Sequence, residues 1–302
     1  MVLIAGPTAS GKSALALALA QLADGVVINA DSAQLYRDIP ILSAAPTADQ
    51  RACADHRLYG FRDGAHPCSA AEWAAMARAE VADAHSKGRL PILVGGTGLY
   101  IRTLLEGIAP VPRIDRHVRE RVRAQSIGQN RAELQEVDAN AAARLHPADT
   151  SRIARALEVV LSTGRTLADW QRKREGGIGD TVDLRPIVLL PPRDWLYKRC
   201  NERFAEMVGD GAIEEARALL ARALNPSLPV MRAIGLREIA ACLAGEIGRE
   251  EMIARGQQST RNYAKRQYTW FKHQPPAAWP RFDRPLDDEA IEDALALLGA
   301  SA

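Results

Sequence analysis

The chain has 302 residues, of which 47% are hydrophobic and 25% charged, so it is long enough to bury a large core and to divide into two units. No apolar run approaches the length that spans a membrane, which argues against a membrane-embedded protein. The four cysteines, Cys53, Cys68, Cys200 and Cys242, form no CxxC pair and indicate neither a zinc site nor a disulfide framework. We therefore expect a cytoplasmic protein with reduced thiols.

A phosphate-binding loop is the clearest feature of the sequence. The apolar run Val2–Ala5 is followed by Gly6-Pro7-Thr8-Ala9-Ser10-Gly11-Lys12-Ser13 and then by an alanine- and leucine-rich segment, 14–20. Strand, GxxxxGK[ST] loop and helix in this order predict a P-loop, a common nucleotide-binding element. Its glycines let backbone N–H groups curl around an anion, Lys12 adds a full positive charge, and Ser13 offers a hydroxyl to Mg²⁺.

Alternating strands and helices after this loop predict a parallel sheet. We expect strands at 26–30 and 90–94, with helices at 69–87 and 97–106 between and after them. The first of these strands is followed by Asp31, whereas the second runs into Gly95-Gly96-Thr97-Gly98 and offers no carboxylate. One acid therefore lies at the carboxyl edge of the sheet, where open α/β sheets bind ligands.

The character of the chain changes from Pro110 onward. Three helices are expected at 113–123, 138–146 and 151–161, and no strand is evident until 185–190. We therefore predict an α/β fold in which a P-loop NTPase-like parallel-sheet core, residues 1–111 and 184–302, carries an all-helical insertion, residues 112–183. The core should end in helices at about 195–208, 211–223, 231–244 and 249–271.

Positive charge is unevenly distributed. Residues 111–174 hold 13 basic and 8 acidic side chains, about +5, although the whole chain carries only +2. The chain also has no acid between Glu251 and Asp283, where arginines and lysines alternate with aromatic residues. Such a stripe suits a nucleic-acid backbone, although taken alone it is equally typical of a solvated helix that packs its aromatics on the core.

Four motifs in this order resemble the tRNA dimethylallyltransferases, also called tRNA isopentenyltransferases. They are the P-loop, Asp31-Ser32-Ala33-Gln34-Leu35-Tyr36-Arg37, Val94-Gly95-Gly96-Thr97-Gly98-Leu99-Tyr100, and Arg232-Ala233-Ile234-Gly235-Leu236-Arg237 with Lys265-Arg266-Gln267 and Thr269-Trp270-Phe271. The resemblance implies transfer of a dimethylallyl group from dimethylallyl diphosphate to N6 of the adenosine 3′ to the anticodon, in tRNAs reading codons that start with U. It also implies a monomer that binds the tRNA anticodon stem-loop and Mg²⁺.

The resemblance further implies a role for each matching residue. Asp31, as general base, Thr97 and Lys12 would be catalytic, and Ser13 would bind Mg²⁺. The diphosphate would be bound by Gly6, Pro7, Thr8, Ala9, Ser10, Gly11, Lys12, Ser13 and Arg232. The tRNA would be bound by Asp31, Ser32, Ala33, Gln34, Thr97, Arg119, Ser151, Arg152, Ile153, Ala154, Arg155, Arg232, Ala233, Ile234, Gly235, Leu236 and Arg237.

The sequence departs from the family in the irregular stretch 36–46, which we expect to be a lid or a substrate wall. Leu42 stands where the family usually has glycine, and Ala45 stands where it usually has lysine. From the residues alone, two other functions stay open: an ATP-dependent kinase of a small molecule or nucleoside, and a non-catalytic RNA-binding switch. A dinucleotide site is disfavoured, because the loop from Gly6 to Gly11 does not fit GxGxxG.

Overall fold

A computed structural model describes residues 1–300. The chain forms two compact units: one comprises Met1–Leu104 together with the chain from Gly179 onward, and the other comprises Leu105–Ile178. The predicted insertion, 112–183, overlaps the second unit, but that unit starts earlier, within helix α4 (Gly98–Glu106), and ends earlier. No helix within residues 1–300 is long and apolar enough to cross a membrane.

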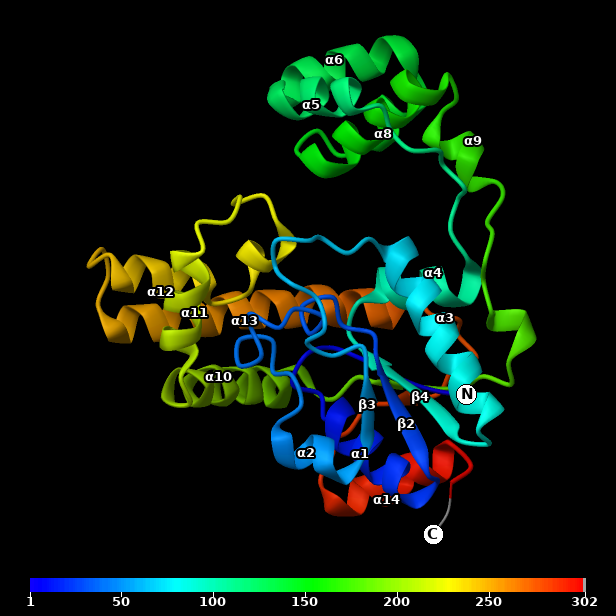
Figure 1. The fold of residues 1–302 in the computed structure, drawn as a ribbon, viewed down its shortest axis with the longest axis vertical. Helices are drawn as coiled ribbons and strands as arrows, with labels where there is room; N and C mark the ends of the chain where they lie inside the picture. Colours follow the sequence, from blue (N-terminus) through cyan, green and yellow to red (C-terminus); the bar gives the residue numbers. More distant parts are fainter. Residues whose placement is uncertain (301–302) are drawn as a thin grey trace. The chain divides into compact units, whose positions relative to one another are not determined.

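The first unit is built on a sheet of six parallel strands (Figure 1). These are β1 (Val2–Ala5), β2 (Gly25–Asn29), β3 (Asp55–Arg57), β4 (Leu90–Gly95), β5 (Arg185–Leu189) and β6 (Arg281–Phe282), in the order β3-β2-β4-β1-β5-β6. Strand β1 lies between β4 and β5, with Ala5 opposite both Gly95 and Val188. The prediction of an α/β, P-loop-like parallel core is confirmed.

Helices α1 (Lys12–Leu22) and α14 (Asp288–Leu297) cover one face of the sheet. The buried cluster on this face joins strand residues to helix residues: Ile4, Val27, Ile92, Val94, Ile187 and Leu189 pack with Leu15, Leu19, Ala290 and Ala294. Strands β1 and β2 are wholly buried, which is typical of parallel strands covered on both faces.

Helix α3 (Ala70–Ser86) contacts β2 and β4 through residues outside that cluster. It begins with the predicted capping box, in which Ser69 Oγ accepts a hydrogen bond from the N–H of Glu72 at 3.1 Å. Trp73 donates its indole N–H to Asn29 O at 2.9 Å and stacks on Tyr100 of α4 with 4.6 Å between ring centroids. These contacts anchor the chain immediately before Asp31.

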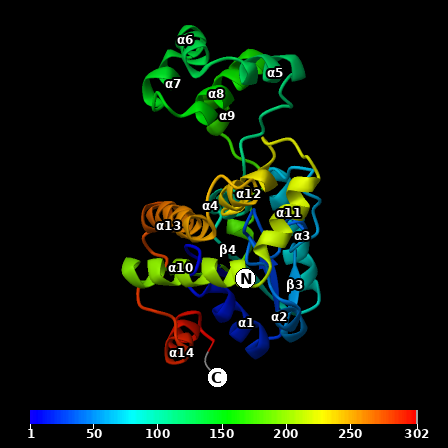
Figure 2. The same cartoon turned by 90° about the vertical axis from the view of Figure 1, so that its left-hand side faces the viewer.

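The rest of the first unit is helical: α10 (Arg193–Gly209), α11 (Ala212–Ala221), the 3₁₀ turn η2 (Pro229–Arg232), α12 (Leu236–Leu243) and α13 (Arg249–His273). Helices α10 and α13 lie side by side in both views (Figures 1 and 2). The prediction of a single helix at 231–244 is wrong. The segment forms η2 and α12, which are separated at Gly235, where φ is +90°. A Cβ at Gly235 would lie 2.5 Å from Phe204, so this turn requires glycine.

The second unit contains five helices among its described residues: α5 (Arg116–Ala124), α6 (Ile127–Val137), α7 (Ala139–Arg144), α8 (Thr150–Thr163) and α9 (Leu167–Gln171). Three correspond to predicted helices, whereas α6 and α9 were not predicted. Helix α5 begins later than predicted, because Asp115 caps it by accepting a hydrogen bond from Val118 N. The hydrophobic core of the second unit includes Val122, Leu134, Ile153 and Leu157.

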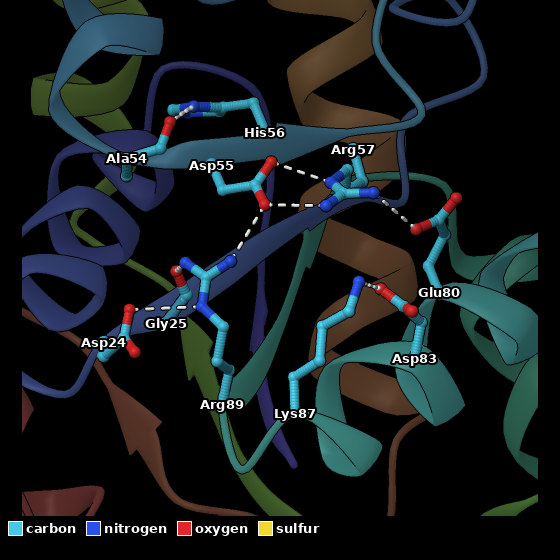
Figure 3. Close-up of polar contacts among 10 residues, drawn as sticks. All are labelled: Asp24, Gly25, Ala54, Asp55, His56, Arg57, Glu80, Asp83, Lys87 and Arg89. Carbon is cyan, nitrogen blue, oxygen red and sulfur yellow. Dashed lines mark hydrogen bonds and ion pairs between the residues drawn. The ribbon is translucent and has the colours of Figure 1, made fainter.

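Five elements of the first unit were also missed: α2 (Ala48–Cys53), the 3₁₀ turn η1 (Gly179–Thr181), β3, β6 and α14. Strand β3 is the three polar residues Asp55, His56 and Arg57, which have no apolar alternation, and it forms by pairing with β2. A charge network lies beside this edge strand (Figure 3). Asp55 accepts hydrogen bonds from Arg57 Nε at 2.7 Å and from Arg89 Nη1 at 2.9 Å. These arginines in turn reach Glu80 and Asp24.

Candidate active site

The P-loop connects β1 to α1, and both of its glycines are required by its geometry. Gly6 has φ +153°, and a Cβ there would lie 2.6 Å from Leu189 O on the neighbouring strand β5. Gly11 has φ +95°, and a Cβ there would lie 2.7 Å from Leu286 Cδ2. Because glycine adopts these positive φ angles and leaves room for the neighbouring atoms, the loop can curl tightly at the start of α1.

The polar groups of this loop are only partly satisfied within the described chain. Lys12 Nζ folds back and donates to Pro7 O at 2.6 Å. Among residues 1–300, Ser10 Oγ is buried without a hydrogen-bond partner, and no side chain caps the amino end of α1. Burial lowers the pKa of Lys12 to about 8, against the attraction of Asp31, which raises it. The loop therefore presents positive potential and free donors to an anion.

Asp31 follows β2 at the carboxyl edge and is held by local hydrogen bonds. Asn29 Oδ1 accepts from Asp31 N at 2.8 Å, and Asn29 Nδ2 donates to Leu58 O at 2.9 Å. Asp31 Oδ1 accepts from Ala33 N at 2.9 Å, which orients the carboxylate. The structure therefore fixes the direction of this acid by backbone contacts.

Thr97 joins the loop after β4 to the loop after β2. Its Oγ1 accepts from Ser32 N at 3.0 Å and donates to Ser32 Oγ at 3.3 Å, while its own N–H donates to Ala30 O at 3.2 Å. Such an approach leaves no room for a side chain at Gly95, where a Cβ would lie 2.2 Å from Ala30. The glycine pair before Thr97 thus brings two of the predicted site segments together.

Two pockets meet at this edge of the sheet, both within the first unit. The larger, about 780 Å³, is lined by residues 8–14 of the P-loop region. The smaller, about 320 Å³, has a largely apolar wall that includes Ile39, Leu42, Phe204, Met207 and Ile234. Five residues line both pockets: Thr8, Asp31, Ser43, Arg203 and Met207. A pocket lined by the P-loop and a largely apolar pocket therefore adjoin at a carboxylate and a guanidinium.

Arg203 is a site residue that the sequence reasoning missed. It extends from α10 and donates from Nη2 to Thr8 Oγ1, whereas its Nε is buried without a hydrogen-bond partner in the part of the chain that the structure describes. Burial lowers its pKa. A signal was present in the sequence: Arg203 lies three residues after Cys200 and seven after Leu196, both fully buried, so it is a charge on the apolar face of its helix.

The irregular stretch 36–46 contributes side chains to the lining of both pockets, and Ser43 lines both. Gln34 Nε2 donates to Ser43 O at 3.0 Å and to Ala44 O at 2.7 Å. From the other side, the carboxylate of Glu215 on α11 accepts from the N–H groups of Ile41 at 2.7 Å and Leu42 at 2.8 Å. Leu42 lines the apolar pocket, and Ala45 lines the larger one.

The other predicted residues fall into three groups. Arg232, Ala233 and Ile234 line the apolar pocket, away from the P-loop residues 9–14, whereas Gly235 and Leu236 are buried and Arg237 is exposed. Arg119, Ser151, Arg152 and Arg155 belong to the second unit, where Arg155 is half-buried and the others are exposed. Ile153 and Ala154 are core residues there, so their side chains offer no surface for a ligand.

The residues present fit a magnesium ion that is held mainly by its substrate. Ser13 is exposed, and it lines the larger pocket together with Lys12 and Asp31. Within the described residues, no group of three His, Cys, Asp or Glu side chains is arranged to hold a metal. Mg²⁺ commonly takes one or two protein ligands and completes its shell with phosphate oxygens and water, so one hydroxyl beside an anion pocket suits it.

Comparison with known proteins agrees with this geometry. A family model described as IPP transferase matches residues 34–274. The chain is 61% identical over 294 residues to a tRNA dimethylallyltransferase of Sphingopyxis alaskensis, covering 97% of this chain and 96% of the relative. It is 60% identical over 288 residues to a tRNA dimethylallyltransferase of Erythrobacter litoralis, covering 94% and 91%.

Two solved structures are similar over most of the chain. The tRNA isopentenylpyrophosphate transferase of Bacillus halodurans superposes with a TM-score of 0.70 at 33% identity, covering 99% of this chain and 96% of that one. A eukaryotic dimethylallyltransferase, described as acting on tRNA, gives a TM-score of 0.78 at 28% identity, covering 89% and 69%. With a family match over most of its length and relatives at 60% identity, this chain is a member of the IPP transferase family.

Proposed function

We propose that this protein transfers a dimethylallyl group from dimethylallyl diphosphate to N6 of the adenosine 3′ to the anticodon, in tRNAs that read codons starting with U. The single observation that carries the chemistry is the shared boundary of the two pockets, where Asp31 and Arg203 lie between a P-loop and an apolar wall. The names of the relatives support the choice of substrates.

In this proposal the diphosphate occupies the larger pocket. Backbone N–H groups of the P-loop, apart from Pro7, which has none, and Thr8, which donates to Gln267, bind its oxygens together with the ammonium of Lys12 and the guanidinium of Arg203. Arg232 adds charge from the apolar side. Ser13 would hold Mg²⁺, which supplies neutralisation of the leaving group's charge. Because Arg203 Nε has no partner in the described chain, an anion that accepts from it removes the cost of that buried donor.

The apolar pocket takes the dimethylallyl group, with the adenine entering beside it. As the bond between the allylic carbon and the diphosphate oxygen breaks, a bond forms between that carbon and N6. The exocyclic amine is a weak nucleophile, so its proton must leave as the bond forms, and Asp31 accepts it. The adenine ring would be surrounded by Ser32, Ala33, Gln34 and Thr97. N6 is inaccessible in a stacked loop, so the adenosine must flip out.

The second unit is proposed to bind the anticodon stem-loop. Arg119 of α5 and Arg152 and Arg155 of α8 provide positive charge for RNA phosphates, and Ser151 of α8 provides a hydroxyl. The side chains of Ile153 and Ala154 are buried, so these two residues would act by holding α8 in place. In the first unit, Ala233, Ile234 and Arg237 would meet the loop, with Gly235 and Leu236 shaping that turn. We further infer that the enzyme acts as a cytoplasmic monomer.

The kinase alternative is not retained, because the chain belongs to the IPP transferase family. The deciding experiment mixes the protein with Mg²⁺, labelled dimethylallyl diphosphate and an unmodified tRNA transcript. We expect label in the RNA at the adenosine after the anticodon, and none when that adenosine is replaced by guanosine. Consumption of ATP with no labelled RNA would contradict the proposal.

A further inference from the structure

Gln267 belongs to a motif that resembles the family, yet the reaction above gives it no role. It lies in α13 and is 6% exposed. Its side-chain amide makes two hydrogen bonds: Oε1 accepts from the N–H of Thr8 at 2.8 Å, and Nε2 donates to Gly96 O at 2.9 Å. One buried amide therefore joins the P-loop to the loop that follows β4.

These two loops leave neighbouring strands, since β1 pairs with β4 and Ala5 lies opposite Gly95. The approach of Gln267 depends on glycine, because a Cβ at Gly96 would lie 2.2 Å from Gln267 Nε2. Among side chains of this length, only the glutamine amide carries both a donor and an acceptor at every pH, and this bridge requires both. Leucine would provide neither, and glutamate, when ionised, would lose the donor.

The hydrogen bonds continue from this bridge toward the reacting groups. Gly96 is followed by Thr97, which holds Ser32 by two contacts, and Ser32 follows Asp31. On the other side, Thr8 Oγ1 accepts from Arg203. A connected path therefore leads from the proposed diphosphate ligands, through Gln267, to the proposed base.

We propose that Gln267 is a positioning residue that sets the spacing between the P-loop and the loops bearing Thr97 and Asp31. This inference rests on the proposed function, because the two substrates bind to different sides of the bridge. The allylic carbon is placed by the diphosphate, whereas N6 is placed by the loops of β2 and β4. Misplacement of reacting groups by about 1 Å can cost about 100-fold in rate, so a bridge at this point controls turnover more than binding.

The test compares Gln267→Leu with Gln257→Leu in the full-length protein. Gln257 lies on the same helix, is partly buried and donates to Asn201 O at 3.1 Å, so its loss removes a similar hydrogen bond away from both loops. For Gln267→Leu we expect kcat to fall about 10- to 100-fold, while KM for tRNA and for dimethylallyl diphosphate each change less than about threefold. Gln257→Leu should have the same kcat as the protein without substitutions.

Gln267→Glu, assayed at a pH at which its carboxyl group is ionised, serves as a second variant, because its shape is nearly unchanged and only the donor to Gly96 O is lost. It should show the same fall in kcat with intact KM values, and circular dichroism should show a folded protein. An unchanged kcat, a rise confined to one KM, or loss of folding in both variants would overturn the proposal. If the unmodified protein transfers no label to tRNA, the proposed function itself fails, and this outcome is distinguishable because it precedes any substitution.

Discussion

The two ends of the central sheet differ in whether their charged side chains are paired with one another. Near the amino ends of β2, β3 and β4, Arg89 pairs with Asp24 and Asp55, and Arg57 at the end of β3 pairs with Asp55 and Glu80 (Figure 3). At the carboxyl ends, Arg203 Nε is buried without a partner in the described chain, and burial lowers the pKa of Lys12 to about 8. The first end is complete as it stands, whereas the second retains positive charge that an anion would satisfy.

This contrast separates charges that hold the fold from charges that await a ligand. Substitution within the paired network should reduce stability and leave catalysis unchanged. Substitution of an unpaired buried charge should reduce catalysis and leave stability unchanged or improved, because a desolvated charge is removed. Measuring both quantities for the same variants therefore tests the comparison directly.

The largest effect is expected for Asp31→Ala. Loss of a general base typically lowers a rate by about 10²- to 10⁴-fold, so transfer of label in a single turnover should nearly cease. Binding of tRNA, measured by filter retention, should change little, because the hydrogen bonds between Thr97 and Ser32 remain. A variant that keeps more than about a tenth of the rate would contradict the assignment of Asp31.

Arg203→Met should show function and stability moving apart. Removing a charge-assisted hydrogen bond costs about 1.5–3 kcal/mol, so affinity for inorganic diphosphate in calorimetry should fall about 10- to 100-fold. The melting temperature should stay equal or rise, because the guanidinium is buried. The exposed Arg217 on α11 provides the control, and Arg217→Met should change neither quantity. A large loss of stability in Arg203→Met would contradict this prediction, because it would show that Arg203 stabilises the fold as Asp55, Arg57 and Arg89 do.

In the second unit, Arg155→Ala should weaken tRNA binding moderately. Removing one phosphate contact should lower the slope of log affinity against log salt by about one, with KM for tRNA raised several-fold and kcat unchanged. Burial lowers the pKa of Arg155, but the ordinary pKa of arginine lies so far above neutral pH that the side chain stays charged. An unchanged salt slope would show that Arg155 does not face the RNA.

The smallest effect is expected for Asp55→Asn, with a loss of about 1 kcal/mol in the free energy of unfolding and no change in kcat. The hydrogen bonds from Arg57 hold the pKa of Asp55 below its usual value. Its contribution is therefore fully present above the unfolded pKa of about 3.9 and is lost as the pH falls through the folded pKa. Urea unfolding should show the difference between the two proteins at neutral pH and its disappearance in acid.

The elements that the sequence predicted well are those whose signals are local. The P-loop, the capped helix at Ser69 and the buried strand at 90–94 each carry their own pattern within a few residues. Strand β3 has no such pattern, since its place depends on β2 and on Arg89. Gln267 was visible only as part of a motif, because its two partners lie 259 and 171 residues away in sequence. Contacts of this range are fixed by packing.

The chain enters and leaves the second unit through adjacent segments. Ile108 and Glu175 exchange both of their backbone hydrogen bonds, each at 3.0 Å. A module whose two ends meet can be excised and the gap closed by a short turn at little entropic cost. We therefore expect a chimaera built at this junction, with the second unit of a relative, to fold. Under the role proposed for this unit, such a chimaera should also bind a different set of RNAs.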